Sequence, residues 1–238
     1  MLFGCGLLFG DLLGSSNYPP LNASHARLSA YFLHNGGEVR ALALLHLLSA
    51  LAMLSFAAYL YTWLGSVERS GHRRPGIALA GGATAATFLL LSALLYRALA
   101  EPAVASDPAL AHALVILSYL AGGAAVAVPL ALPIGAVAVA ALRSPTGLPR
   151  WSGWLGFAAA AASLASALTL LGPMNNSSAL YALLLLAPIL DFAWLLLTSL
   201  ILASRVEQPA IEPPTGDLTR TPTAIRTSAR PSMSSSAS

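Results

Sequence analysis

The sequence predicts an all-α membrane protein, a polytopic bundle of about five transmembrane helices, and two observations support this prediction. Hydrophobic residues make up 57% of the 238-residue chain and charged residues only 9%, whereas soluble domains carry roughly 25% charged residues. The apolar residues also form blocks of about 20 or more, the length that crosses roughly 30 Å of hydrocarbon as a helix. A chain with so little polar surface cannot face water on all sides.

The apolar blocks that are long enough to span a bilayer delimit a predicted transmembrane bundle over residues 41–205. These blocks are 41–64, 76–98, 110–142, 151–172 and 179–203. The third block contains Pro129 and Pro133, so it is either one helix kinked at the prolines or two helices that break near them. We favour the kink, because no charged residue interrupts the block before Arg143.

Two segments at the ends of the chain differ from the spans in length or composition. Residues 1–14 are apolar but reach only about 20 Å as a helix. They are interpreted as a half-span, either the end of a first span that begins upstream or a short re-entrant or interfacial stub. Residues 206–238 are rich in Pro, Ser and Thr and lack a periodic apolar pattern, which predicts a disordered tail.

Residues 15–40 are polar enough to lie outside the membrane, and they contain the pattern of one short helix. Asn22 or Ser24 is suited to cap its N-terminus. Apolar residues then recur near helical spacing up to about His34, and the glycine pair that starts at Gly36 is typical of a helix end. We expect an extracytoplasmic helix that lies on the membrane surface.

The arginine residues are unevenly distributed over the loops, and this distribution predicts the orientation of the bundle. Short loops that are rich in arginine and lysine face the cytoplasm. One side of the membrane is expected to hold Arg69, Arg73, Arg74, Arg143, Arg150 and Arg205, and the other holds Arg27, Arg40 and Arg97. The protein is therefore expected in the inner (plasma) membrane, with its C-terminus in the cytoplasm.

Small residues four apart recur in three of the predicted spans, which indicates how the helices associate. Lipid tails are as apolar as leucine, so helices in a bilayer associate through close packing of small residues and through polar contacts. The alternative is that such spacing arises by chance in an alanine-rich chain. The expected packing residues are Gly82, Ala86, Ala131, Gly135, Ala158 and Ala162.

The motifs of common catalytic and cofactor-binding sites are missing from the sequence. It contains no lysine, no phosphate-binding loop and no HExxH, CxxC or GxSxG motif. The histidines are not at metal-ligand spacing, and they are His25, His34, His46, His72 and His112. We therefore expect no cofactor and no metal, and favour a protein that is not an enzyme. The scattered basic residues give no patch for nucleic acid.

Two ionisable residues, one histidine and one aspartate, lie inside the predicted spans, away from the three residues at each end, and are the candidates for a proton or solute role. His46 is near the start of the first span, where a neutral imidazole is tolerated. Asp191 is near the middle of the fifth span, where a carboxylate costs about 2.5–3.5 kcal/mol on insertion scales. The apolar residues of that span outweigh this cost. Each residue is therefore either a functional group or a structural one that bonds to a neighbouring helix.

The surroundings of Asp191 can be predicted from helical spacing. Residues three, four or seven positions away share its face, and they are Leu184, Ala187, Trp194 and Thr198. Pro188 removes one backbone hydrogen bond just before Asp191. We expect this face to pack against other helices, with a hydroxyl or water as the partner of the carboxylate and no salt bridge.

The fourth span opens with LPRWSGWLG at residues 148–156, which places Arg150, Trp151 and Trp154 at one membrane interface as anchors. Similar openings occur in an uncharacterised family of multi-pass membrane proteins from high-GC bacteria, and the chain resembles that family over roughly residues 7–205. The use of arginine for all 12 basic residues agrees with a high-GC origin. The resemblance implies a domain of unknown function and transfers no catalytic residues. The short first span departs from the family pattern.

Three functions remain open at this point. The favoured one is a non-enzymatic scaffold or regulator of another membrane protein, with the lipid bilayer as its surroundings. The first alternative is a small carrier or accessory transport subunit that uses Asp191 and His46, which predicts an aqueous path to Asp191. The second is an intramembrane or lipid-modifying enzyme, which needs several polar residues that converge at one interface.

Overall fold

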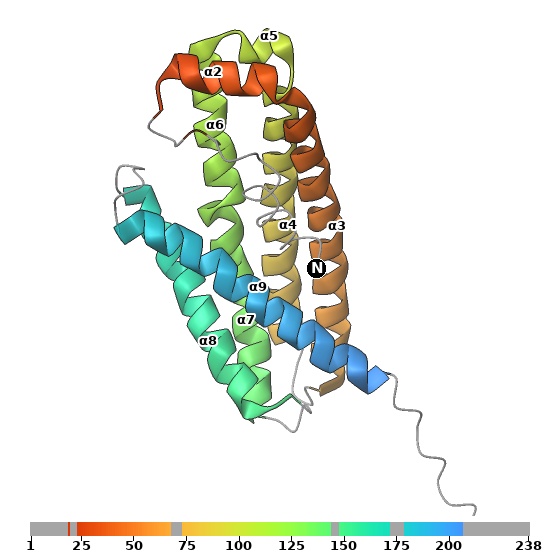
Figure 1. Ribbon diagram of the computed structural model, residues 1–238. Helices are drawn as coiled ribbons and strands as arrows, with labels where there is room; N and C mark the ends of the chain where they lie inside the picture. The colour runs from red at the N-terminus through yellow and green to blue at the C-terminus, as the bar shows by residue number, and fades with distance from the viewer. Residues whose placement is uncertain (1–18, 20–22, 68–72, 144–147, 172–178, 207–238) are drawn as a thin grey trace, which may run out of the picture.

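The computed structural model describes residues 19, 23–67, 73–143, 148–171 and 179–206. Every element within these ranges is a helix (Figure 1). Five helical stretches are long and apolar enough to cross a membrane, namely Gly36–Val67, Arg73–Leu99, Pro108–Arg143, Arg150–Leu171 and Leu186–Ser204. The predicted all-α transmembrane bundle is confirmed. The half-span at residues 1–14 and the tail after Val206 lie outside the described residues.

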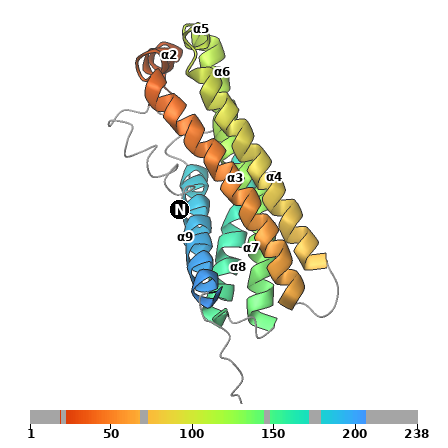
Figure 2. The same cartoon turned by 90° about the vertical axis from the view of Figure 1, so that its right-hand side faces the viewer.

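The spanning helices run up and down between two ends of the bundle (Figures 1 and 2). The elements are α2 (His25–His34), α3 (Gly36–Val67), α4 (Arg73–Leu99), α5 (Pro102–Ala105), α6 (Pro108–Gly122), α7 (Ala124–Arg143), α8 (Arg150–Ala165), the 3₁₀ helix η1 (Ser166–Leu171) and α9 (Ala179–Val206). α2 and α5 lie at one end, which we call the α2 end. Arg73, Arg143 and Arg150 lie at the opposite end, as alternation of the spans requires.

The short helix α2 forms where the sequence predicts it. The hydroxyl of Ser24 accepts a hydrogen bond from the backbone N–H of Arg27 at 3.4 Å and caps the helix. Leu28 and Phe32 are buried on its inner face. The helix ends at His34, as expected, and α3 begins at Gly36, before the apolar block that starts at residue 41. Only Asn35 therefore separates α2 from α3, and the glycine pair lies in the first turn of α3.

The third span is interrupted at a different place from the one predicted. α6 ends at Gly122, and α7 begins at Ala124, so the break lies at the glycine pair and both prolines lie inside α7. A Cβ atom at Gly122 would lie 2.8 Å from the hydroxyl oxygen of Ser92 on α4. Close contact with α4 thus requires glycine here, and glycine also weakens a helix.

The prolines of α7 instead support its contact with α4. Pro133 has no N–H, so the carbonyl of Pro129 loses its partner within the helix. A Cβ atom at Gly81 of α4 would lie 2.6 Å from this carbonyl oxygen and 2.6 Å from the Cβ of Leu132. The absence of a side chain at Gly81 lets the two backbones approach at the freed carbonyl, which is how membrane helices tolerate proline.

The small residues expected to pack between helices lie in different surroundings. Gly82 lies against Ala57 of α3, whose Cβ would be 2.5 Å from an added Cβ, and Ala86 and Ala131 are buried in the main core. Gly135 has no atom within 4 Å of an added Cβ, so it makes no close contact.

The predicted stripe on α8 is not the face that packs within this chain. Ala158 is exposed and Ala162 is half-buried. The face of α8 that packs in this chain carries Gly153, Gly156 and Ser163, all buried. In an alanine-rich helix two small-residue stripes compete, and the one with glycines approaches its neighbours most closely.

Candidate functional site

Asp191 is buried at the contact between α9 and α8, as expected for a carboxylate in a span. Its side chain is 1% exposed, and that of Ser163 on α8 is 0% exposed. The Ser163 hydroxyl lies 2.7 Å from Oδ1 and 2.7 Å from Oδ2 of Asp191. One hydroxyl proton is therefore shared between two carboxylate oxygens, and the partner is a hydroxyl on a neighbouring helix.

The face of α9 predicted from helical spacing is the buried one. Ala187, Trp194 and Thr198 are each at most 1% exposed; the side chain of Leu184 lies outside the described residues. Pro188 is part of α9 and does not end it. The periodicity around Asp191 therefore placed its immediate neighbours correctly.

Trp194 makes the second polar contact between α9 and α8. Its indole Nε1 donates to the backbone carbonyl of Ser152 at 3.1 Å. A Cβ atom at Gly156 would lie only 2.7 Å from this nitrogen and 3.0 Å from the Cβ of Ala138 on α7. Gly156 thus provides the space in which the indole ring lies between α8 and α7.

The α8–α9 contact as a whole combines one carboxylate with a few hydroxyl groups. Ser166 and Thr169 are buried near Ser163, but their hydroxyls donate to carbonyls of their own chain segment, Ser163 and Ser166 respectively. Thr198 Oγ1 is buried and has no hydrogen-bond partner among the described residues. The arrangement can hold two helices together, and its described buried side chains include a single ionisable group, Asp191.

His46 lies in a separate polar cluster between α3, α4 and α6. Its Nδ1 is 3.5 Å from the Ser92 hydroxyl, and its ring meets the edge of Tyr96 with 5.2 Å between centroids. Ser92 donates to the backbone carbonyl of Ser118 at 3.3 Å. We call His46, Ser92, Tyr96 and Ser118 the His46 cluster.

The two candidates for a proton or solute role are thus placed at different helix interfaces. Asp191 contacts α8 from α9, whereas His46 contacts α4 from α3. The hydropathy of the two spans, and the position of each residue within its span, identified both as intramembrane groups. They carried no information about whether the helices that bear them are neighbours.

The structure brings together two histidines that the sequence analysis left unpaired. His25 of α2 and His112 of α6 have ring centroids 4.3 Å apart and ring planes inclined by 32°. His25 precedes the buried Leu28 and Phe32 by three and seven positions, and this helical stripe is the available signal that it lies on the side of α2 that meets α6. Among the described residues there is no group of three or more side chains that would hold a metal ion.

The three expected interface anchors lie at the start of α8, at the end of the bundle opposite α2. Arg150 is the first residue of α8 and is exposed. Trp151 and Trp154 are 53% and 67% exposed in the isolated chain. Large aromatic side chains that point outward at a helix end suit the headgroup region of a bilayer.

Three comparisons with known proteins found no match to this chain. No family model matches the chain, and no curated protein or solved structure matches it. The fold itself defines the class, a multi-pass integral membrane protein whose intramembrane carboxylate is bonded between two of its own helices.

Proposed function

We propose that this chain is a non-enzymatic membrane protein that scaffolds or regulates another membrane protein. The observation that carries the proposal is the placement of its two intramembrane ionisable residues. Asp191 is buried and accepts a hydrogen bond from Ser163, and His46 is part of a different helix interface. Both groups thereby hold the bundle together, which is the role that a scaffold requires of them.

The carrier alternative has less support from the site. A carrier needs water to reach its proton- or solute-binding group, but Asp191 is 1% exposed. The cavity between α4, α6, α7 and η1 is lined by apolar residues, and Asp191 is not one of them. An enzyme needs several reactive groups at one point, and the described side chains of the α8–α9 contact offer one carboxylate with one bonded hydroxyl.

The proposed location is the inner membrane of a bacterium with the arginine-rich end in the cytoplasm. Support comes from the arginine residues at the ends of α4, α7 and α8 opposite α2, together with the rule that such loops remain inside. The LPRWSGWLG opening of α8 supports membership of the uncharacterised high-GC bacterial family that it resembles.

The scaffold and the carrier are distinguished by Asp191→Asn, with Glu38→Gln as the matched control because Glu38 is an exposed carboxylate. The amide replaces the carboxylate in shape, so we expect Asp191→Asn to retain the complex with the membrane partner at the stoichiometry of the native protein. Proteoliposomes that contain the native chain should show no proton flux that depends on Asp191. Proton-coupled uptake that Asp191→Asn abolishes and Glu38→Gln preserves would overturn the proposal in favour of a carrier.

A further inference from the structure

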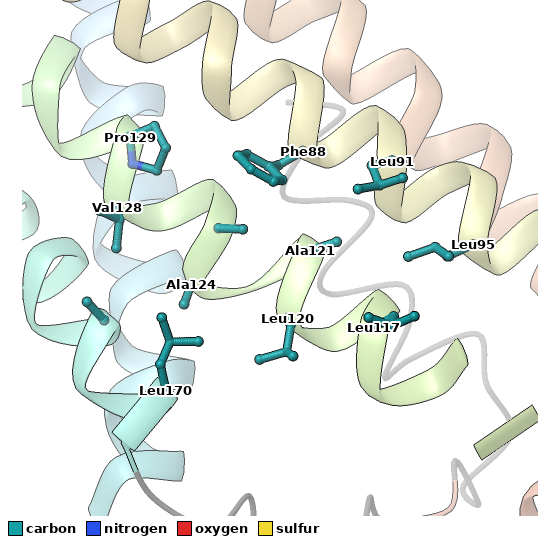
Figure 3. A pocket seen from close by; sticks show the side chains of 12 residues that line it. Phe88, Leu91, Leu95, Leu117, Leu120, Ala121, Ala124, Val128, Pro129 and Leu170 are labelled. Carbon is teal, nitrogen blue, oxygen red and sulfur yellow. The ribbon is translucent and has the colours of Figure 1, made fainter. Parts of the chain in front are cut away.

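A cavity of about 550 Å³ lies on the flank of the bundle, between α4, α6, α7 and η1 (Figure 3). Among the described residues, no charged, amide or hydroxyl side chain lines it. The lining residues are Phe88, Leu91, Leu95, Leu117, Leu120, Ala121, Ala124, Ala125, Val128, Pro129, Ala167 and Leu170. Figure 3 shows these side chains around the place where α6 ends and α7 begins.

The cavity follows from the break between α6 and α7. Gly122 holds the end of α6 against Ser92 of α4, and α7 continues from Ala124 after the non-helical Gly123. The wall beside the break is built from alanines, including Ala121 and Ala125. Larger side chains at these positions would fill the space, so the recess depends on both the glycine pair and the small residues around it.

The dimensions and depth of the cavity match one leaflet of a bilayer. Its lining runs from Leu117 to Pro129 along the third span, which is about 18 Å at 1.5 Å per residue. One leaflet contributes about 15 Å to the roughly 30 Å of hydrocarbon. Pro129 lies near the middle of the span Pro108–Arg143, and Leu117 lies towards the α2 end. The cavity therefore extends from the midplane into the leaflet on the α2 side.

The apolar side chains that line the cavity determine which kind of molecule can occupy it. Water needs two to four polar partners to remain in a cavity, and the twelve described side chains that line this one offer none. The rim is continuous with the lipid-facing surface of the bundle, because Leu91, Leu117 and Leu170 line the cavity and are also 43%, 50% and 62% exposed. We propose that the cavity binds one acyl chain of a phospholipid from the leaflet on the α2 side. This proposal is independent of the scaffold role.

The direct test uses the native full chain in nanodiscs with a phospholipid that carries a photoreactive diazirine in the middle of one acyl chain. After irradiation, peptide mapping by mass spectrometry locates the labelled residues. We expect labelling in Leu117–Pro129 and Ala167–Leu170 to exceed that of the exposed face of α3, around Leu44 and Leu51, several-fold. Equal labelling of both surfaces would show ordinary boundary lipid and would overturn the proposal.

A blocking variant gives a second readout. Ala125→Phe places a ring in the cavity from a half-buried position on α7, and Ala158→Phe places the same ring on the exposed face of α8. We expect Ala125→Phe to lose the excess labelling several-fold and Ala158→Phe to retain it. If Ala125→Phe does not fold, labelling of the native chain decides alone. Lipid adducts at the exposed face of α3 with none on the cavity lining, in the native chain and in Ala158→Phe alike, would contradict an acyl-chain site.

Discussion

Replacing Ser163 with alanine removes the hydroxyl that bonds the intramembrane carboxylate. The Ser163 hydroxyl lies 2.7 Å from each oxygen of Asp191, and both side chains are at most 1% exposed. Bulk water is therefore excluded from the position of the lost donor. A buried polar group left without a partner costs about 1–3 kcal/mol. We expect Ser163→Ala to lower the free energy of unfolding by this amount.

A double-mutant cycle with Asp191→Ala isolates the contact from the loss of packing. Hydrogen bonds between membrane helices give coupling energies that average about 0.6 kcal/mol and reach about 1.7 kcal/mol. We expect the coupling energy of the Ser163–Asp191 pair to lie between this average and this maximum. Ser166→Ala is the matched control, because Ser166 is equally buried but donates to a backbone carbonyl of its own segment. Its coupling to Asp191 should be close to zero.

The assay is reversible unfolding by dodecyl sulfate in mixed micelles, followed by tryptophan fluorescence. Trp194 lies one turn from Asp191 and is 1% exposed, so it reports separation of α9 from α8. Independent sites add within about 0.3–0.5 kcal/mol. A Ser163–Asp191 coupling energy inside that margin, or one no larger than that of the Ser166 control, would refute the assignment of this pair as a contact that holds the two helices together.

Two further outcomes are expected. Gly156→Ala brings a Cβ within 2.7 Å of Trp194 Nε1 and should destabilise the bundle by about 1–3 kcal/mol in the same assay. A Cβ added at Gly135 has no atom within 4 Å, so Gly135→Ala should leave the stability unchanged or raise it. If both variants lost the same free energy of unfolding, a steric clash at Gly156 would be excluded as the cause. The Arg97 hydrogen bond lowers the pKa of exposed Glu101, so Arg97→Gln should raise that pKa in a carboxyl ¹³C NMR titration. The contribution of the pair to stability is present at neutral pH and is lost as the pH falls through the lowered pKa; an unchanged pKa in Arg97→Gln would contradict the pairing.

The spans could be predicted from the sequence because length and apolarity alone determine whether a helix can cross a bilayer. The buried face of α9 could also be predicted, since Ala187, Trp194 and Thr198 lie at helical spacing from Asp191. These properties are local to one helix. They need no knowledge of which helix lies beside it.

The details that depend on two helices could not be predicted in this way. The bond from Ser163 to Asp191 and the contact between His25 and His112 join residues far apart in the sequence. The break at Gly122 was missed because proline is the stronger helix breaker in isolation, whereas close packing against Ser92 decides the position here. Helical spacing also does not distinguish one small-residue stripe from another, so it could not show that Gly156 packs within the chain while Ala158 is exposed.

The most direct test of the five-span bundle with a cytoplasmic C-terminus is a topology map made with reporter fusions to the full set of loops. Fusions after Arg74, Arg150 and Arg205 should report the cytoplasm, and fusions at Ser106 and Asn176 should report the opposite side of the membrane. Inverted signals at two or more of these positions would contradict the topology.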